Sequence, residues 1–409
     1  MELPDRATRG RITYRVDLVR SAFHAILFEG TLAFGLLVAI RYFEAPAFGK
    51  GLVSAAFSIG LLASPIGLYL IRQTGLEVSR AGSLLLIIGA GGVVIAAGAN
   101  AFWVFAAGLL FASMLFAQLP QLVVQMYSNN FTPSERGARL SHFIFTGAAS
   151  AGLFSWLAGD ALDHDISSFR WVFVVIAVAA VCSGLLLRMI PTLPLSHKNS
   201  GNPWQNLRLA WDDKLFGLLL TGWMIMGIGN LLTIPLRYEY LANPLYNLNL
   251  PNAQIAIILV LVPSVFRIIG AMIWGQLFDR INFITVRVCL NLLIMSGILL
   301  FFFSKTLPFL ILASVFTGLA LGGANIAWTL WVTKVAPEEK VPAYMSVHTG
   351  TTGFRGVLAP FLGYFILTEV GPTNASLISA SLIIISTFLF LSLWKNPRFT
   401  KKGEAIGPS

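Results

Sequence analysis

The chain has 409 residues, of which 56% are hydrophobic and 11% charged, and its formal net charge is +10. Its apolar runs are longer than the roughly 20 residues that a membrane-spanning helix needs. This composition excludes an ordinary soluble globular protein and predicts a multi-pass protein in a lipid bilayer. All spans should be helices, because lipid cannot satisfy the open edge of a strand.

The hydropathy pattern predicts an all-α membrane protein with twelve transmembrane helices. The predicted spans are residues 18–42, 50–72, 79–98, 102–126, 139–161, 170–190, 215–240, 254–278, 284–304, 307–333, 343–368 and 374–394. A charged tail precedes the first span, without the short apolar core and small-residue cleavage site of a secretory leader. We therefore expect no cleaved signal peptide.

The orientation follows from the basic residues. If the N-terminus is inside, 21 of the 28 Lys and Arg residues lie in inner segments. Basic loops are retained on the cytoplasmic side, so both termini should be cytoplasmic, with the protein in the cell (inner) membrane. The positive charge then reflects topology and contact with anionic lipid, and we expect no nucleic-acid partner.

The longest polar interval between spans, residues 191–214, divides the chain into two sets of six helices. We therefore expect an N-terminal bundle in residues 1–190, a cytoplasmic linker in residues 191–214, and a C-terminal bundle with a cytoplasmic tail in residues 215–409.

The linker contains an apolar stripe at positions i, i+3 and i+7, made by Trp204, Leu207 and Trp211. Such a stripe beside charged residues is typical of a short helix at the headgroup level. A disordered linker is the alternative.

The two halves resemble each other at a nearly fixed offset, which is common in transporters. The loop at residues 132–136 corresponds to residues 336–340 at an offset of 204. The segment Gly67-Leu-Tyr-Leu-Ile71-Arg72 can be aligned with Gly275-Gln-Leu-Phe-Asp279-Arg280 at an offset of 208. These two agreements indicate an internal duplication.

At these residues the chain resembles the major facilitator superfamily, whose hallmark is G-x-x-x-D-R/K after the second span and often after the eighth. The resemblance implies two pseudo-symmetric six-helix bundles. It also implies that Gly275, which would let helix and loop approach closely, is a gating residue, as are Asp279, Arg280 and Arg72. The first copy departs from the pattern, because Ile71 replaces the acid. Spans four and five lack the motifs of proton-coupled drug antiporters, so drug export is the less favoured alternative.

Single charges lie near the middle of three spans, namely Glu29, Arg267 and Arg355 in spans 1, 8 and 11. A charge at the bilayer centre costs about 2.5 to 3.5 kcal/mol, so such residues indicate a buried polar path. The resemblance implies that spans 1, 4, 7 and 10 line a cavity, flanked by 2, 5, 8 and 11. Spans 3, 6, 9 and 12, which should face lipid, have no charge in their interiors.

The three charges sum to +1, because arginine stays protonated. A substrate carboxylate, phosphate or sulfate can compensate for this charge, since the guanidinium group binds such oxyanions in a bidentate manner. The alternative is that one Arg pairs with Glu29 and the other binds backbone carbonyls. Glu29 itself is predicted either to couple protons to transport or to be a fixed ion-pair partner.

Other polar residues in the spans could contact a solute. His348 shares a helix face with Arg355, Gln121 belongs to a glutamine stripe in the fourth span, and amides and indoles suit hydroxyl-bearing or ring-shaped ligands. The predicted substrate-binding residues are Arg267, Arg355, His348, Gln121, Asn230, Asn325 and Trp328. Packing is the alternative role for each of them.

The sequence has no P-loop, no metal-ligand cluster and no nucleophile motif. The two cysteines, Cys182 and Cys289, fall inside predicted helices and are expected to be small core residues. We therefore expect no enzyme activity, no catalytic residue, no cofactor and no bound metal.

Together these patterns predict a secondary transporter that takes up a small polar, anionic solute by proton-coupled symport. The expected partners are a small-molecule substrate, a proton or other coupling ion and the lipid bilayer, and we expect a monomer. The alternatives are a transporter of a neutral sugar, an exporter, or a non-transporting receptor on the same fold.

Overall fold

A computed structural model describes residues 4–195, 206–337 and 340–396. The helices are α1 (Arg6–Arg41), α2 (Ala47–Leu62), α3 (Ser64–Thr74), α4 (Val78–Ala97), α5 (Phe102–Phe116), α6 (Leu119–Asn130), α7 (Pro133–His164), η1 (Ile166–Ser168), α8 (Phe169–Arg188), α10 (Leu209–Asp212), α11 (Lys214–Ala242), η2 (Pro244–Tyr246), α12 (Asn252–Ala256), the π-helical η3 (Ile257–Leu261), α13 (Val262–Arg280), α14 (Phe283–Phe303), α15 (Leu307–Leu330), η4 (Trp331–Lys334) and α16 (Val341–Ser392).

The helices account for the twelve predicted spans. In the described residues, ten helical segments are long and apolar enough to cross a membrane, and the pair α2 and α3, bent by 51°, makes an eleventh span. The twelfth arises because α16, 52 residues long, contains non-helical Gly371 at φ 77°. Glycine adopts this conformation readily, and Pro372 cannot continue the hydrogen bonding of the helix before it. The prediction of an all-α, twelve-span protein is confirmed.

Proline also explains the breaks inside single spans. Pro65 lies at the start of α3, Pro120 at the start of α6 and Pro263 at the start of α13. Each removes a backbone donor just where one helical segment gives way to the next. Spans 2, 4 and 8 are therefore composite.

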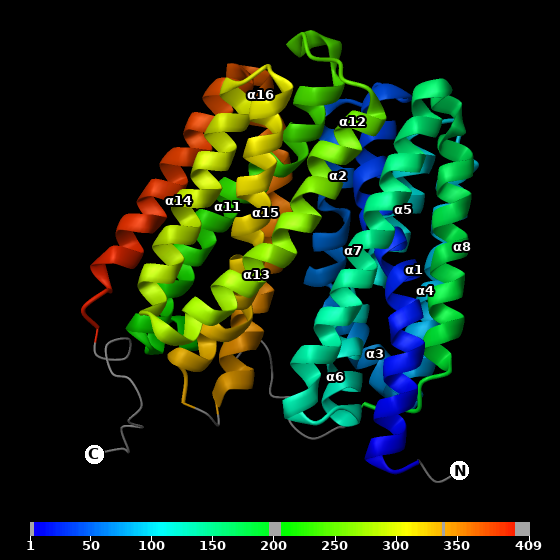
Figure 1. The fold of residues 1–409 in the computed structure, drawn as a ribbon, viewed down its shortest axis with the longest axis vertical. Coiled ribbons are helices and arrows are strands. Elements are labelled where there is room, and N and C mark those ends of the chain that lie inside the picture. The colour runs from blue at the N-terminus through cyan, green and yellow to red at the C-terminus, as the bar shows by residue number, and fades with distance from the viewer. Residues whose placement is uncertain (1–3, 196–205, 338–339, 397–409) are drawn as a thin grey trace.

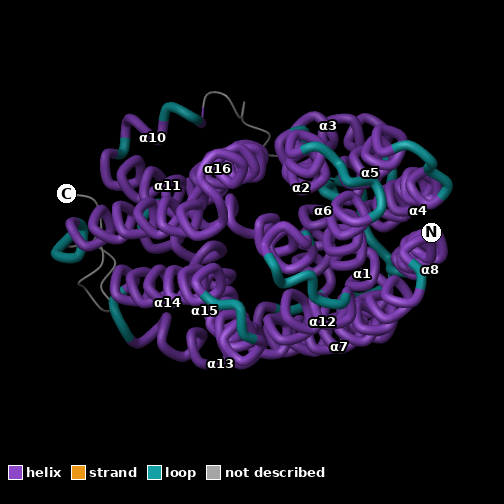
Figure 2. Tube along the Cα trace, turned by 90° about the horizontal axis from the view of Figure 1, so that it is seen from above, coloured by secondary structure: helices purple, strands orange, loops and turns teal. Residues whose placement is uncertain are grey.

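The two sets of spans form two bundles that lie side by side (Figures 1 and 2). The N-terminal bundle contains α1–α8 and the C-terminal bundle contains α11–α16. Within them, helices approach closely at glycines: a Cβ on Gly92 would lie 2.7 Å from the Gly108 oxygen, and a Cβ on Gly322 would lie 2.5 Å from the Arg267 oxygen. Such small-residue contacts are typical of helix packing in membranes.

The first helix begins earlier than predicted. It starts at Arg6 rather than residue 18, and its N-cap Asp5 accepts a hydrogen bond from the Thr8 amide at 3.3 Å. The hydropathy pattern marked only the apolar part of this helix, because its first turns carry charged side chains.

The predicted linker helix is only partly described. Trp204 lies outside the described residues, Leu207 packs against the core, and Trp211, 76% exposed, lies in the short α10. The boundaries of the linker and of the two domains stay predictions.

The bundles meet at the end of the molecule away from both termini, which we call the sealed end. Arg41 of α1 donates to Asn252 Oδ1 at 2.6 Å and to the Ala242 carbonyl at 3.3 Å. Asp163 of α7 accepts from the backbone amides of Asn252 and Ala253 at 2.6 and 3.0 Å. Both residues thereby connect the N-terminal bundle to the C-terminal bundle.

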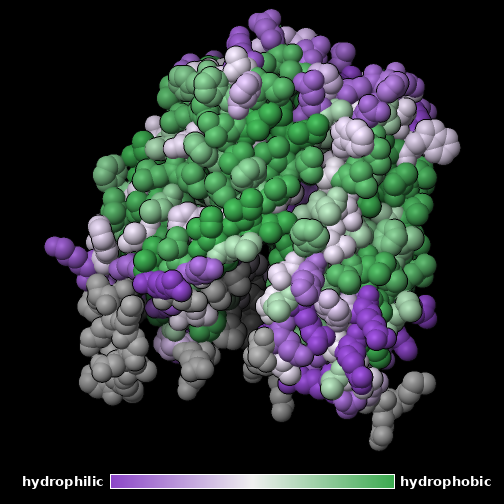
Figure 3. Space-filling view, in the orientation of Figure 1, coloured by the Kyte–Doolittle hydropathy of each residue, from purple (hydrophilic) through white to green (hydrophobic). Residues whose placement is uncertain are grey.

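A buried ion pair adds to this seal. Lys50 of α2 lies 2.7 Å from Glu239 of α11, and the two side chains are 13% and 3% exposed. The same ammonium group lies 5.3 Å from the ring centre of Tyr364. At the opposite, terminal end the surface is notched between the bundles (Figure 3). The structure is therefore closed at the sealed end.

Replacing Arg41 by alanine should loosen the sealed end, because it removes charge-assisted hydrogen bonds between the bundles. A loss of about 2 kcal/mol corresponds to a roughly thirtyfold shift toward opening. Ser54→Cys introduces a single thiol in a background in which Cys182 and Cys289 are replaced. The measurement is the rate at which a membrane-impermeant thiol reagent, applied from the sealed side, labels this thiol.

Arg170→Ala is the matched control, because Arg170 donates only within the N-terminal bundle, to the Ala97 carbonyl and Asn100 Oδ1. It should label at the parent rate. Equal labelling of both arginine variants would contradict the assignment of Arg41 to the seal.

Candidate functional site

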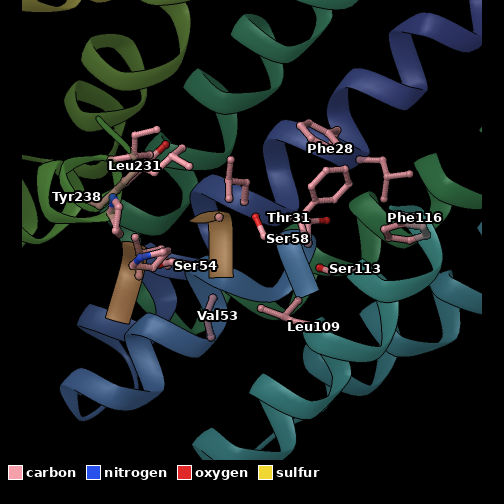
Figure 4. Close-up of a pocket in the computed structure, with 18 residues that line it drawn as sticks. Phe28, Thr31, Val53, Ser54, Ser58, Leu109, Ser113, Phe116, Leu231 and Tyr238 are labelled. Carbon is pink, nitrogen blue, oxygen red and sulfur yellow. The ribbon is translucent and has the colours of Figure 1, made fainter. Parts of the chain in front are cut away.

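A cavity of about 190 Å³ lies between the two bundles. Figure 4 shows Phe28 and Thr31 of α1 on one side and Leu231 and Tyr238 of α11 on the other. Its hydroxyl groups come from Thr31, Ser54, Ser58, Ser113 and Tyr238, and the other lining residues are apolar, without a charged side chain among those described. The cavity can hold a small organic group and offer it a few hydrogen bonds.

Glu29 and Arg267 form an ion pair that joins the two bundles. Glu29 Oε1 on α1 lies 3.9 Å from Arg267 Nη2 on α13, and the side chains are 24% and 32% exposed. Phe28 and Thr31, one and two positions from Glu29 in the sequence, line the cavity, whereas Glu29 and Arg267 are not among its lining residues. The pairing is one of the two alternatives that the sequence left open for Glu29.

Arg355 and His348 lie inside the C-terminal bundle. Arg355 is 6% exposed, and its Nη1 donates to the Trp223 carbonyl. The guanidinium group reaches α11 at Gly227, where an added Cβ would lie 2.3 Å from Nη1. His348 is fully buried. Their predicted contact with a substrate stays a prediction.

Arg287 was missed by the sequence interpretation, which placed no charge in the interior of the ninth span. It lies at the fifth position of α14, is fully buried, and stacks 3.9 Å from the Trp223 ring centre. Its position near the end of the span suggested a solvated residue. The available signal was that Arg287 lies inside the hydrophobic segment, whereas a solvated basic residue would precede it.

The remaining predicted substrate-binding residues are dispersed. Gln121 donates to Ser64 Oγ at 2.8 Å within the N-terminal bundle. Trp328 donates to Thr352 Oγ1 at 3.3 Å, and Asn230 is half-buried on α11. Asn325 of α15 is exposed. The Trp328 ring also lies 5.1 Å from the His348 ring, so Trp328, His348 and Arg355 are grouped inside the C-terminal bundle, while the seven residues do not form one site.

The predicted gating residues lie at the terminal end. Arg72 is half-buried near the end of α3, and Arg280 is exposed at the end of α13. The side chain of Asp279 is not among those described. Among the described residues, a Cβ on Gly275 would lie 3.7 Å from Ile326 Cδ1, which is an ordinary van der Waals contact. The gating roles stay predictions.

A second buried charge group lies in the N-terminal bundle. Asp17 of α1 is fully buried, pairs with Arg20 and accepts a hydrogen bond from the Tyr127 hydroxyl of α6. Because Asp17 precedes the predicted start of the first span, the sequence interpretation treated it as outside the membrane. Each charge compensates for the burial of the other.

The cysteines are in the predicted helices, α8 and α14, and both are free. The expectation that both are core residues is wrong for Cys289, which is exposed. It lies on the outer face of its helix, where a sulfhydryl group is tolerated by lipid.

Two helical bundles with a cavity between them define a multi-pass membrane protein with the fold of a secondary transporter. The Major Facilitator Superfamily model matches residues 240–408. This match covers part of the C-terminal half of the chain, and the described chain as a whole shares its fold with solved transporter structures.

Solved structures share the fold at low sequence identity. The nucleoside transporter NupG aligns at a TM-score of 0.76 and 15% identity, over 93% of this chain and 100% of its own. A bacterial homolog of the human lysosomal transporter Spinster, in an inward-facing conformation, gives 0.69 and 14%, over 96% and 99%. The human organic anion transporter MFSD10 gives 0.64 and 15%, over 93% and 99%. No curated relative matches the chain by sequence.

Replacing Asp17 by asparagine should destabilise the protein by about 3 to 5 kcal/mol, because it leaves Arg20 buried without its counter-charge. Thermal unfolding of the purified protein measures the loss. The double variant Asp17→Asn/Arg20→Gln should recover most of it, since no unpaired charge remains.

Glu77→Gln is the control. Glu77 pairs with Arg80 at 3.3 Å, but the side chains are 39% and 57% exposed. Such a pair contributes about 1 kcal/mol or less. If Asp17→Asn and Glu77→Gln lower the stability of the protein equally, burial does not determine how much the Asp17–Arg20 pair stabilises it.

Proposed function

We propose that this protein is a proton-coupled symporter that moves a small organic anion by alternating access. The observation that supports this proposal is the Glu29–Arg267 ion pair, which joins the bundles beside their shared cavity and stays partly exposed. In this proposal the terminal end faces the cytoplasm, and the sealed end faces outward. The conformation is then inward-facing.

The pair supplies a coupling mechanism. While Glu29 is ionised, it occupies Arg267 and competes with a substrate carboxylate or phosphate for the guanidinium group. When Glu29 takes up a proton, Arg267 becomes available to bind the substrate anion in a bidentate manner. Proton and anion therefore favour each other's binding, and by linkage the effect is reciprocal. The consequence is symport rather than exchange.

The cavity supports an organic rather than an inorganic substrate. Phe28, Phe57 and Phe116 contribute aromatic faces, and the serine and threonine hydroxyls provide hydrogen bonds. A solute with a ring or short apolar body could pack here with its anionic group near Arg267. Rocking of the bundles about this region would alternate its exposure.

Glu29→Gln should separate coupling from binding. The neutral amide leaves Arg267 free at every pH, so counterflow of the anion between equal solutions should persist in proteoliposomes. Accumulation driven by a pH gradient should be lost. The measurement compares the two modes of transport over a panel of organic acids, sugar acids, neutral sugars and drugs.

Arg267→Gln should weaken binding of the anion by about 2 to 3 kcal/mol, which is a factor of roughly 30 to 150, because a charge-assisted hydrogen-bonding partner is removed. Arg237→Gln is the control, since Arg237 donates to Thr317 Oγ1 within the C-terminal bundle. Unchanged anion affinity in the Arg267 variant would refute the assigned role.

A neutral solute is the second candidate. The observation that favours it is the cavity lining, in which no charged side chain is found among the described residues. Since Glu29 and Arg267 compensate each other, the site would then carry no net charge. Transport of a neutral sugar with affinity unchanged by Arg267→Gln would support this candidate, and absence of flux for the whole panel would favour a receptor.

A further inference from the structure

A group of cationic and aromatic side chains fills the interior of the C-terminal bundle near its terminal end. We call it the C-terminal cluster; it consists of Arg287, Arg355, His348, Trp223 and Trp331. The first four come from α14, α16 and α11, and Trp331 begins η4. None of the five side chains is more than 6% exposed. The cluster is therefore separate from the cavity between the bundles.

The cluster is tightly packed around its rings. The Arg287 guanidinium stacks on Trp223 at 3.9 Å, and the imidazole of His348 lies 5.5 Å from the Trp223 ring and 5.2 Å from the Trp331 ring. Arg355 donates to the Trp223 carbonyl, so both guanidinium groups lie against the same tryptophan. Two like charges thus share one buried region.

Most polar atoms of the cluster have no hydrogen-bond partner among the described residues. These atoms are Nε, Nη1 and Nη2 of Arg287, Nε of Arg355, both ring nitrogens of His348 and the indole nitrogens of Trp223 and Trp331. Nearly all of them can donate, and the arginine and indole nitrogens can only donate. The cluster therefore presents a set of buried donors without acceptors.

The counter-charge is missing as well. Among the described residues, no carboxylate forms an ion pair with Arg287 or Arg355. Two other buried cations have a carboxylate partner, Arg20 with Asp17 and Lys50 with Glu239, while Arg237 has the Thr317 hydroxyl as its partner. Arginine cannot relieve the cost of burial by losing its proton, and water can satisfy the donors but cannot neutralise the charge.

We propose that the C-terminal cluster binds a small inorganic anion such as chloride, held by Arg287 and Arg355 with the indole N–H groups as further donors. Because the rings pack closely, the proposed ligand is an ion of few atoms rather than an organic solute. The anion compensates for the two cations and stabilises the C-terminal bundle. This site does not depend on the identity of the transported solute.

The test is thermal unfolding of the purified full-length protein in detergent at constant ionic strength. Sodium gluconate is the reference, and chloride, bromide, nitrate, sulfate and phosphate are the probes. A ligand that binds only the folded state raises the unfolding temperature with its concentration. We expect a saturable rise with at least one probe and none with gluconate. No saturable response to any probe overturns the proposal.

Arg287→Gln tests the site itself. It removes one uncompensated charge, so the anion response should disappear while the unfolding temperature in gluconate stays equal or rises. A purely structural arginine would instead lower that temperature. Arg237→Gln is the control, because Arg237 is a buried arginine of the same bundle, 5% exposed and bonded to Thr317; its anion response should match the parent's.

Trp331→Phe provides a second variant if Arg287→Gln does not fold. It keeps an aromatic ring and removes one N–H donor, so the apparent dissociation constant of the anion should rise about tenfold, as expected for one lost hydrogen bond to a charged group. A parent-like response in both Arg287→Gln and Trp331→Phe, or in whichever of them folds, overturns the proposal.

Discussion

The arrangement of this protein depends on the cost of burying a charge away from water. Arginine cannot become neutral, so every buried guanidinium group requires a carboxylate, a set of carbonyls or an anion. The N-terminal bundle meets this requirement for Arg20 with Asp17, and between the bundles Glu29 pairs with Arg267 and Glu239 pairs with the ammonium group of Lys50. The C-terminal bundle contains three buried arginines, Arg237, Arg287 and Arg355, without a carboxylate ion pair among the described residues. The proposed coupling and the proposed anion site both follow from how these charges are matched.

The two ion pairs that join the bundles differ in burial. The pair between Glu29 and Arg267 is partly exposed, which suits a contact that a proton or solute can open. The pair between Lys50 and Glu239 is more deeply buried, which suits a closed gate. In the proposed mechanism, burial therefore distinguishes an ion pair that takes part in binding from one that holds a conformation.

Much of the fold could be predicted from the sequence, because twelve apolar runs, the proline and glycine breaks and the repeated loop motifs are local signals. The candidate site was less accessible. Glu29 and Arg267 were identified from their depth in the spans, but Arg287 and Asp17 lie near span ends, where hydropathy cannot distinguish a buried charge from a solvated one. The orientation of the Arg355 side chain depends on a tertiary contact, because its guanidinium group packs where Gly227 has no side chain. A local sequence pattern does not reveal such a contact.

The cap that Asp163 places on α12 has a consequence for sequence variation at the sealed end. Two of its hydrogen bonds go to main-chain amides, and any residue except proline, which lacks the amide hydrogen, can supply such a donor. Asn252 also accepts from Arg41 through its own side chain, so only position 253 is held by its backbone alone. The acidic partner has no substitute of equal length and charge. Evolutionary drift should therefore be broad at position 253 and narrow at positions 163 and 252.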